Sequence, residues 1–256
     1  MADTEFAFGW VRDTPDFRDH LFMAPEPIVG ALPSSYSLRA SFPDPYNQGQ
    51  VGSCTGNAVA GIVQYQRTKK VGAAKSWVPS RLFLYYNGRA LEGTTKADAG
   101  ASLRDVIKCL VNQGVCPETN WPYNTAKVFT KPGATPYKVA MKYQAVSYQS
   151  VPQDLTQMKA CIAGGNPIVL GISVYESFMS PQVAQTGVVS LPSPTERLLG
   201  GHAVLVVGYD DATQTFQMRN SWGTGWGDHG YFTIPYSYLT NPNLCADLWT
   251  VITLEA

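Results

Sequence analysis

The clearest helical pattern in the chain begins after Ser53 and continues for about seventeen residues. Ala58, Ile62 and Tyr65 fall on one stripe at helical spacing, with further apolar residues beside it. Basic residues close the stretch, where they favour the negative end of the helix dipole. The pattern predicts a long helix that directs an apolar face into a core.

Two more helices are expected before the pattern changes. They cover about 79–90 and 102–112, and the second ends where Gly114 suits the position after a helix terminus. Beyond residue 130, short apolar runs bounded by turn residues replace the helical spacing, apart from one short helix within 151–163. The expected strands lie within 168–175, 201–210, 215–223, 230–235 and 248–254.

This order of elements predicts an α+β fold, with a mainly helical first half and a second half built mainly on sheet. A cleft between two such lobes is a natural place for a site. Residues 1–31 lack periodicity and are expected to form an extended arm. The arm holds six large apolar side chains, so we expect it to dock and to cover part of the cleft. These are Phe6, Phe8, Trp10, Phe17, Leu21 and Phe22.

Composition narrows the possible partners and surroundings. The 256 residues are 45% hydrophobic and carry no formal net charge, which gives no reason to expect nucleic acid or an anionic membrane as a partner. No apolar run approaches the ~18 residues of a membrane-spanning helix. The first residues do not form a secretory signal peptide. We expect a cytoplasmic protein, or one exported without a classical signal.

Five cysteines and three scattered histidines, without a CxxC motif, predict neither a metal site nor a cofactor. The cysteines are also too sparse for a disulfide scaffold, so free thiols in a reducing compartment are expected. Cys109 and Cys116 could still pair, and the sequence leaves this open.

The stretch "QGQVGSCTGNA" places Cys54 at the start of the long helix. A helix N-terminus and a nearby imidazolium can lower a thiol pKa from about 8.5 by several units, so a resting thiolate–imidazolium pair with His202 is expected. If the following hairpin turns at Asp211, His202 faces Asn220 with Cβ atoms about 5 Å apart. The Asn220 oxygen would then accept from one ring nitrogen and leave the other to the thiol. A bulge would break this register.

Each of these residues alone has a simpler structural explanation. A lone cysteine after Gly-Ser is usually a small buried residue, and a histidine that opens an apolar strand usually belongs to the core. Together with Gln48 and the block "NSWGTGWG", however, they converge on one mechanism of nucleophilic catalysis.

The blocks "QGQVGSCTGNA", "GHAV" and "RNSWGTGWGDHGY" resemble the signatures of papain-like cysteine proteases over about residues 32–252. The segments "FGWVRDTPDFRD" and "GVCPETNWPY" are most similar to the bacterial branch typified by xylellain. The resemblance implies a helical left lobe (about 45–128) and a β-barrel right lobe (about 129–240), with the chain ends crossing over. Residues 1–31 would form an extension of the peptidase domain, 32–256.

The resemblance also implies the role of each site residue. Cys54 would be the nucleophile, His202 the general base and acid, and Asn220 the residue that orients His202. The Gln48 side chain and the Cys54 backbone N–H would form the oxyanion hole. Trp222 would pack over the His202–Asn220 pair and border the bound peptide or protein substrate.

The pocket for the second substrate residue before the scissile bond is expected to be roomy and neutral, open to bulky apolar side chains. The sequence leaves open whether Trp249 or Thr250 forms the floor of this pocket. Small, uncharged residues replace the larger or acidic ones of papain along its walls, namely Gly100, Ala101, Ser102, Gly200 and Gly201.

Two departures from the family pattern are visible. Val51 stands where many relatives have a disulfide-forming cysteine, and Thr55 replaces the usual aromatic residue. An amidase or transpeptidase with the same catalytic residues, or a catalytically silent cleft-binding protein, stay as alternatives. The intact set of four site residues argues against the silent protein, and the choice between endo- and exopeptidase is left open.

Overall fold

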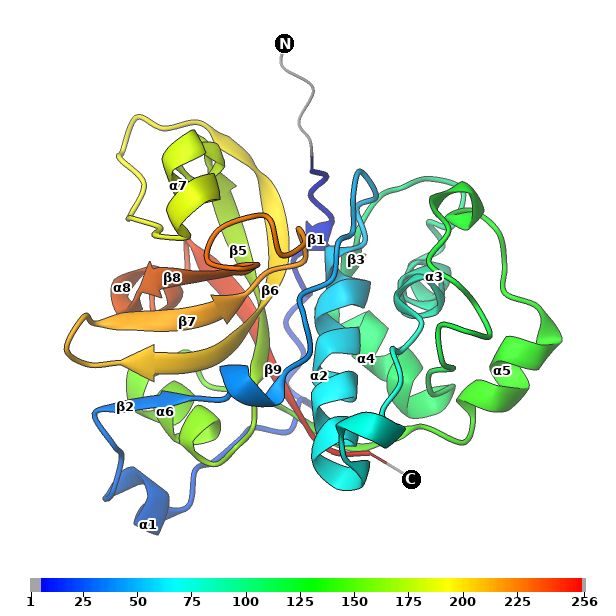
Figure 1. The fold of residues 1–256 in the computed structure, drawn as a ribbon, viewed down its shortest axis with the longest axis horizontal. Coiled ribbons are helices and arrows are strands. Elements are labelled where there is room, and N and C mark those ends of the chain that lie inside the picture. The colour runs from blue at the N-terminus through cyan, green and yellow to red at the C-terminus, as the bar shows by residue number, and fades with distance from the viewer. Residues whose placement is uncertain (1–5, 255–256) are drawn as a thin grey trace.

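The computed structural model describes residues 6–254, with the helices α2 to α5 on one side and the sheet with the other helices on the other side (Figure 1). The α-helices are α1 Glu26–Val29, α2 Cys54–Val71, α3 Arg81–Glu92, α4 Leu103–Asn112, α5 Ala134–Ala140, α6 Leu155–Ala163, α7 Pro181–Thr186 and α8 Tyr236–Leu239. The strands are β1 Trp10–Val11, β2 Ser35–Ser37, β3 Ala101–Ser102, β4 Ala145–Ser150, β5 Ile168–Tyr175, β6 Leu198–Asp210, β7 Thr215–Arg219, β8 Tyr231–Pro235 and β9 Cys245–Leu254. The predicted α+β class and its long helices are confirmed.

One antiparallel sheet has the strand order β4-β9-β5-β6-β7-β8, and β2 also pairs with β6. The long strand β6 organises it. β5 pairs with the first part of β6, β2 pairs with its last residues, and β7 pairs with its second half. The start of β6, which carries His202, is therefore held by β5.

The hairpin of β6 and β7 departs from the predicted register. Next to the turn, Tyr209 lies opposite Phe216, three residues from the predicted register, and Val206 lies opposite Met218, two residues from it. A bulge between Val206 and Gly208 interrupts the ladder, and β7 ends one residue before Asn220. Asn220 therefore does not face His202 across a regular ladder.

Helix α2 runs through the centre of the molecule, and its residues from Cys54 to Tyr65 are all buried. The prediction gave this helix a single apolar face, but neighbours pack against it from several sides. Gly56 permits a close approach of α3, because a Cβ there would lie 2.7 Å from the Arg81 carbonyl oxygen.

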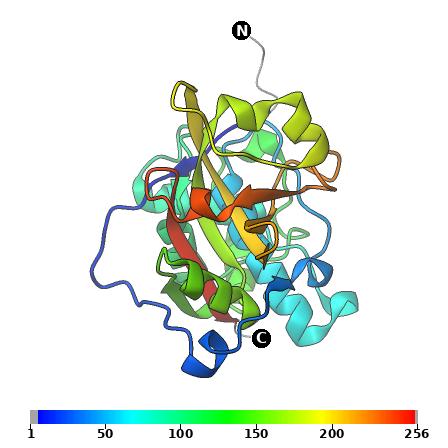
Figure 2. The same cartoon turned by 90° about the vertical axis from the view of Figure 1, so that its left-hand side faces the viewer.

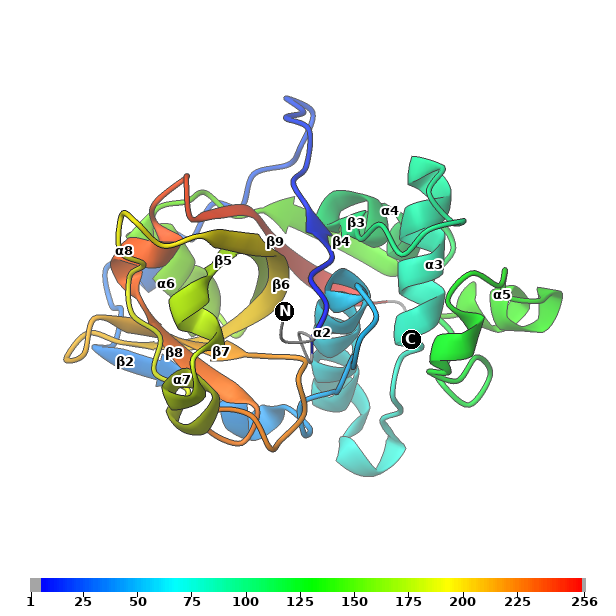
Figure 3. The ribbon, with the colours of Figure 1, turned by 90° about the horizontal axis from the view of Figure 1, so that it is seen from above.

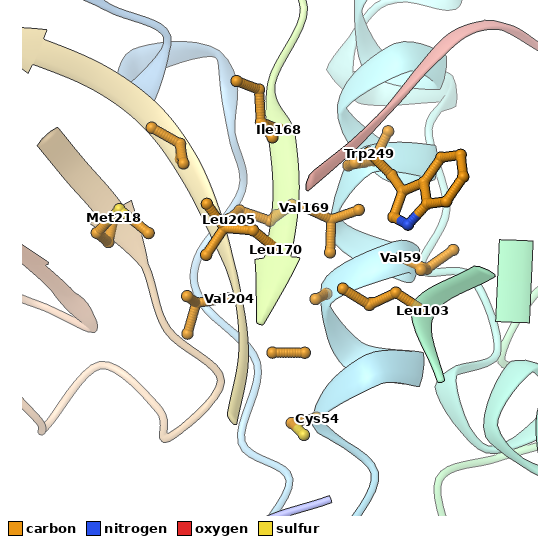
Figure 4. Packing of buried hydrophobic residues seen from close by; sticks show 14 of the residues in the cluster. Cys54, Val59, Leu103, Ile168, Val169, Leu170, Val204, Leu205, Met218 and Trp249 are labelled. Carbon is orange, nitrogen blue, oxygen red and sulfur yellow. The ribbon is translucent and has the colours of Figure 1, made fainter. Parts of the chain in front are cut away.

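A continuous apolar core joins the helices to the sheet (Figure 4). Val59 comes from α2, Leu103 from α4, Val169 from β5, Leu205 from β6 and Trp249 from β9, and all five are almost completely buried. Because these elements share one core, the start of α2 and the start of β6 are fixed relative to each other.

Helix α5 belongs with the helical side of the molecule (Figure 1). The Tyr137 hydroxyl donates to Asn87 Oδ1 at 2.7 Å, and its ring lies 4.9 Å from that of Phe83. We therefore place the crossing from the helical lobe to the sheet lobe between α5 and β4, later than residue 129.

The N-terminal arm is largely extended, and it docks only in part as expected. Phe22 is buried, and Phe6, Phe8 and Trp10 pack against the core. Phe17 and Leu21, however, are 100% and 59% exposed, so the expectation that they dock is wrong.

For Phe17 the reason lies in Arg104, which donates to the Thr14 carbonyl and pairs with Asp19. These contacts close the intervening residues into a loop that stands away from the body (Figure 2).

Two further expectations concern cysteines and membranes. All five cysteines are unpaired and buried, so Cys109 and Cys116 form no disulfide in this structure. Within residues 6–254, no helix has both the length and the apolar character to cross a bilayer.

The contact at Gly56 predicts a stability change. Gly56→Ala should lower the free energy of unfolding by about 1–2 kcal/mol, because overpacking against Arg81 outweighs the better helix propensity of alanine. Urea denaturation measures the change. Gly133→Ala is the matched control, since a Cβ there meets no atom within 4 Å. Equal stability of the two variants would contradict the packing argument.

Candidate active site

Cys54 is the first residue of α2, and its thiol is completely buried. Backbone N–H groups of Ala203 in β6 and Gly9 in the arm approach the sulfur and favour its charged form. The thiol therefore lies where the helix start, the strand that carries His202 and the arm converge. The sequence motifs predicted that the helix start meets the strand of His202, and the aromatic content of the arm predicted that it covers part of the cleft.

The predicted contact between His202 and Asn220 is confirmed, although the register that suggested it is wrong. His202 Nε2 lies 2.8 Å from Asn220 Oδ1. The indole of Trp222 stacks on the imidazole, with ring centroids 4.8 Å apart and an interplanar angle of 26°. His202 Nδ1 is buried without a hydrogen-bond partner among the described residues. This nitrogen is the one left for exchange of a proton with a thiol.

The Gln48 side chain is held on both of its polar atoms. Its Oε1 accepts from the Ser221 hydroxyl at 2.6 Å, and its Nε2 donates to the Val51 carbonyl at 2.9 Å. The second N–H of Nε2 donates to the carbonyl of Ala7 in the arm at 3.0 Å. A peptide carbonyl therefore occupies the position that the resemblance assigns to the oxyanion.

The arm passes between the helical side and the sheet, over the start of α2 (Figure 3). Its strand β1 pairs in parallel with β3, and Ala101 N–H donates to the Gly9 carbonyl at 2.9 Å. At the other edge, Phe6 stacks on Trp222 with ring centroids 4.5 Å apart. Phe8 packs on the backbone of Gly200. The arm thus meets residues on both predicted walls of the substrate cleft.

Gly9 passes through the narrowest point of this path. A Cβ on Gly9 would lie 1.7 Å from the Gly52 carbonyl oxygen. On the other side, Gly100 has φ +77°, and a Cβ there would lie 2.4 Å from the Gly9 carbonyl oxygen. Glycine is therefore required on the arm at this point.

The predicted substrate pocket contains the indole of Trp10. The ring lies against Gly171 and Gly201, and its Nε1 donates to Asp247 Oδ2 at 2.9 Å. The expectation of a neutral pocket is wrong, because this carboxylate lies at its end. Neither residue proposed for the floor makes this contact, since Trp249 donates to Asp13 and Thr250 to the Pro167 carbonyl.

Burial dominates the protonation of the Cys54–His202 pair. It raises the pKa of the Cys54 thiol to about 11, and nearby backbone N–H groups only partly offset this rise. Burial also lowers the pKa of His202 to about 4, although the bond to Asn220 acts in the opposite direction. With the arm docked, both groups are uncharged at neutral pH. Burial by the docked arm therefore opposes the expected resting thiolate–imidazolium pair.

Ser221, Asp98 and Tyr123 support the site, and the sequence reasoning missed all three. Asp98 Oδ2 accepts from the Gly52 N–H at 2.8 Å, and its other oxygen accepts from the Tyr85 hydroxyl. The Tyr123 hydroxyl donates to the Gln48 carbonyl at 2.9 Å. Ser221 stands inside the quoted "NSWG" block, so the motif could have revealed it. Asp98 and Tyr123 lie in irregular stretches that carry no such signal.

Within the described range 6–254, no group of three or more His, Cys, Asp or Glu side chains is arranged to hold a metal ion.

Comparisons with known proteins agree with this geometry. Residues 32–246 match the family model described as papain family cysteine protease. A peptidase C1-like protein of Acanthamoeba polyphaga mimivirus is 34% identical, over 95% of this chain and 86% of its own length. Xylellain, a cysteine protease from Xylella fastidiosa, has a similar structure, with a TM-score of 0.91, 39% identity and 96% of each chain covered.

A procathepsin B from Trypanosoma congolense shares the fold, with a TM-score of 0.78 at 19% identity, over 98% of this chain and 87% of its own. The matched range, 32–246, extends across both sides of the molecule and spans the positions of Cys54, His202 and Asn220. The chain therefore belongs to the papain family of cysteine proteases.

Proposed function

We propose that this protease hydrolyses peptide bonds with Cys54 as nucleophile, His202 as general base and acid, and Asn220 as the residue that orients the imidazole. One observation carries the proposal. A peptide already lies at the site, with the Ala7 carbonyl on the Gln48 amide and the Gly9 N–H near the thiol. The same groups can receive a substrate backbone once the arm has left.

The reaction follows from the positions of these groups. His202 Nδ1 takes the thiol proton, and the Cys54 sulfur attacks the substrate carbonyl carbon. The carbonyl oxygen gains negative charge, which hydrogen bonds from Gln48 Nε2 and the Cys54 backbone N–H stabilise. The C–N bond then breaks as His202 returns its proton to the leaving amine, and a thioester remains. Water attacks the thioester while His202 takes a proton, and the carboxylic acid is released.

Asn220 and Trp222 give the imidazole the direction that this sequence needs. The bond from Nε2 to Asn220 fixes the ring so that Nδ1 is the exchanging nitrogen. Trp222 covers the pair and keeps water from competing for that bond.

We also assign the arm the role of an intramolecular cover of the cleft. It occupies the Gln48 donor, approaches the thiol and fills the substrate pocket, so no peptide can bind productively while it stays docked. Similarity to procathepsins, named for their proforms, is consistent with an N-terminal cover. Activity then requires the arm to open.

A reducing compartment fits this assignment. The nucleophile must be a free thiol, and all five cysteines are unpaired in the structure.

The nucleophile assignment predicts complete dependence on one thiol. Cys54→Ala should abolish hydrolysis of peptide reporters and leave the circular dichroism spectrum and melting temperature close to those of the parent. Cys109→Ala, which removes another buried thiol, is the matched control and should keep activity. Substantial hydrolysis by the Cys54 variant would refute the assignment.

The oxyanion assignment predicts a loss of turnover at Gln48. Gln48→Ala removes a donor that the transition state needs, so kcat should fall on the order of 100- to 1000-fold. Steady-state kinetics on a peptide reporter measure the effect. A kcat close to that of the parent would mean that another donor holds the oxyanion.

The cover assignment predicts activation by a single methyl group. Gly9→Ala in the full chain should raise peptide hydrolysis at least about tenfold, because its Cβ collides with the Gly52 carbonyl and disfavours docking. Phe17→Ala, at a fully exposed arm position, is the control and should change little. Unchanged or lower activity of the Gly9 variant, with the fold intact, would argue that the arm does not limit access.

A further inference from the structure

The pocket that holds the Trp10 indole is shaped by missing side chains. A Cβ on Gly171 of β5 would lie 1.9 Å from the indole, and one on Gly201 of β6 would lie 2.6 Å from it. Two neighbouring strands therefore leave a flat recess that fits a long or broad side chain, and any larger residue at either position would fill it.

The polar end of this recess is Asp247 of β9. Its Oδ2 accepts from the Trp10 indole at 2.9 Å and from the Asp13 N–H at 2.7 Å. Both of these donors belong to the arm. When the arm opens, the carboxylate loses its hydrogen-bond partners among the described residues and still faces the recess. Asp247 also has φ +58°, a backbone conformation that aspartate and asparagine tolerate better than most residues.

We infer that Asp247 makes this pocket select peptides whose side chain ends in a hydrogen-bond donor, namely arginine, lysine or tryptophan, at the second position before the scissile bond. The inference rests on the proposed function and names its substrate class. A basic side chain would replace the lost donors and neutralise a partly buried carboxylate. Tryptophan would repeat the contact that Trp10 makes, whereas leucine or phenylalanine would leave the carboxylate unpaired.

Other charged groups near Asp247 set the limits of this effect. Asp13 and Arg12 leave with the arm. Arg104 of α4 stays, and it is already engaged with Asp19 and the Thr14 carbonyl in the docked state. If Arg104 turned onto Asp247 after the arm opens, the charge would be satisfied internally and the preference for a basic side chain would be absent.

The test uses the full chain with Gly9→Ala, which disfavours docking of the arm, and Trp10→Ala, which empties the recess, with and without Asp247→Asn. Dipeptide reporters vary only the pocket residue among Arg, Lys, Trp, Phe and Leu, and kcat/KM is measured for each. With Asp247 present, kcat/KM for the Arg and Lys reporters should exceed that for the Leu reporter by about tenfold. Asp247→Asn should bring this ratio close to one. Because Asn keeps an oxygen acceptor, the preference for Trp over Phe should survive.

The ratio of kcat/KM for two reporters on the same variant cancels any general loss of activity that the substitution causes. Asp105→Asn, which removes a carboxylate of α4 that contacts Lys108, is the matched control and should leave the Arg-to-Leu ratio intact. An Arg-to-Leu ratio that Asp247→Asn does not change, or one near one in both backgrounds, would overturn the inference.

Binding of the same peptides to a chain with Cys54→Ala, Gly9→Ala and Trp10→Ala separates this inference from the proposed function. Fluorescence anisotropy should give the same ranking without turnover. If the ranking holds but no reporter is cleaved by the chain with Cys54 intact, the proposed function fails and the pocket assignment stands. If the ranking is absent, the pocket assignment fails whatever the outcome for hydrolysis.

Discussion

The passage of the arm backbone between Gly52 and Gly100 is the constraint on which the state of the active site depends. Only a glycine fits at that point of the arm, since a Cβ on Gly9 would lie 1.7 Å from the Gly52 carbonyl oxygen. The close approach brings one arm carbonyl to Gln48 and one arm N–H to Cys54. It also removes water from the thiol and the imidazole. Steric fit, occupation of the oxyanion position and loss of charge are therefore consequences of one contact.

The same site depends on bonds that join the two sides of the molecule. Gln48 precedes α2, and Ser221 follows β7, yet the Ser221 hydroxyl donates to the Gln48 side chain and the Gln48 N–H donates to the Ser221 carbonyl. These bonds tie the oxyanion donor to the chain segment that carries Asn220. The imidazole, its orienting amide and the oxyanion donor are consequently positioned as one unit.

Periodic features were predictable from the sequence, and features that depend on single contacts were not. The helix after Ser53 and the strand before Asp210 follow from apolar spacing. The His202–Asn220 contact was expected from an incorrect register, because the turn lies later than Asp211 and already places Asp210 opposite Thr215. The chain beyond β7 still returns Asn220 to the imidazole. Docking of the arm followed from its aromatic content, but the exposure of Phe17 depends on how Arg104 closes a loop.

The protonation states of Cys54 and His202 could not be predicted from the sequence for a related reason. The motif indicates which groups meet, whereas their charge depends on burial by a segment distant in sequence. The central claim is that the docked arm holds His202 neutral, and 15N NMR of the histidine rings in the full chain at pH 6 tests it most directly. Substitution of His20 and His229 assigns the signals. A pKa lowered to about 4 predicts a neutral ring that is protonated on Nε2. A doubly protonated His202 ring at pH 6 would contradict the account.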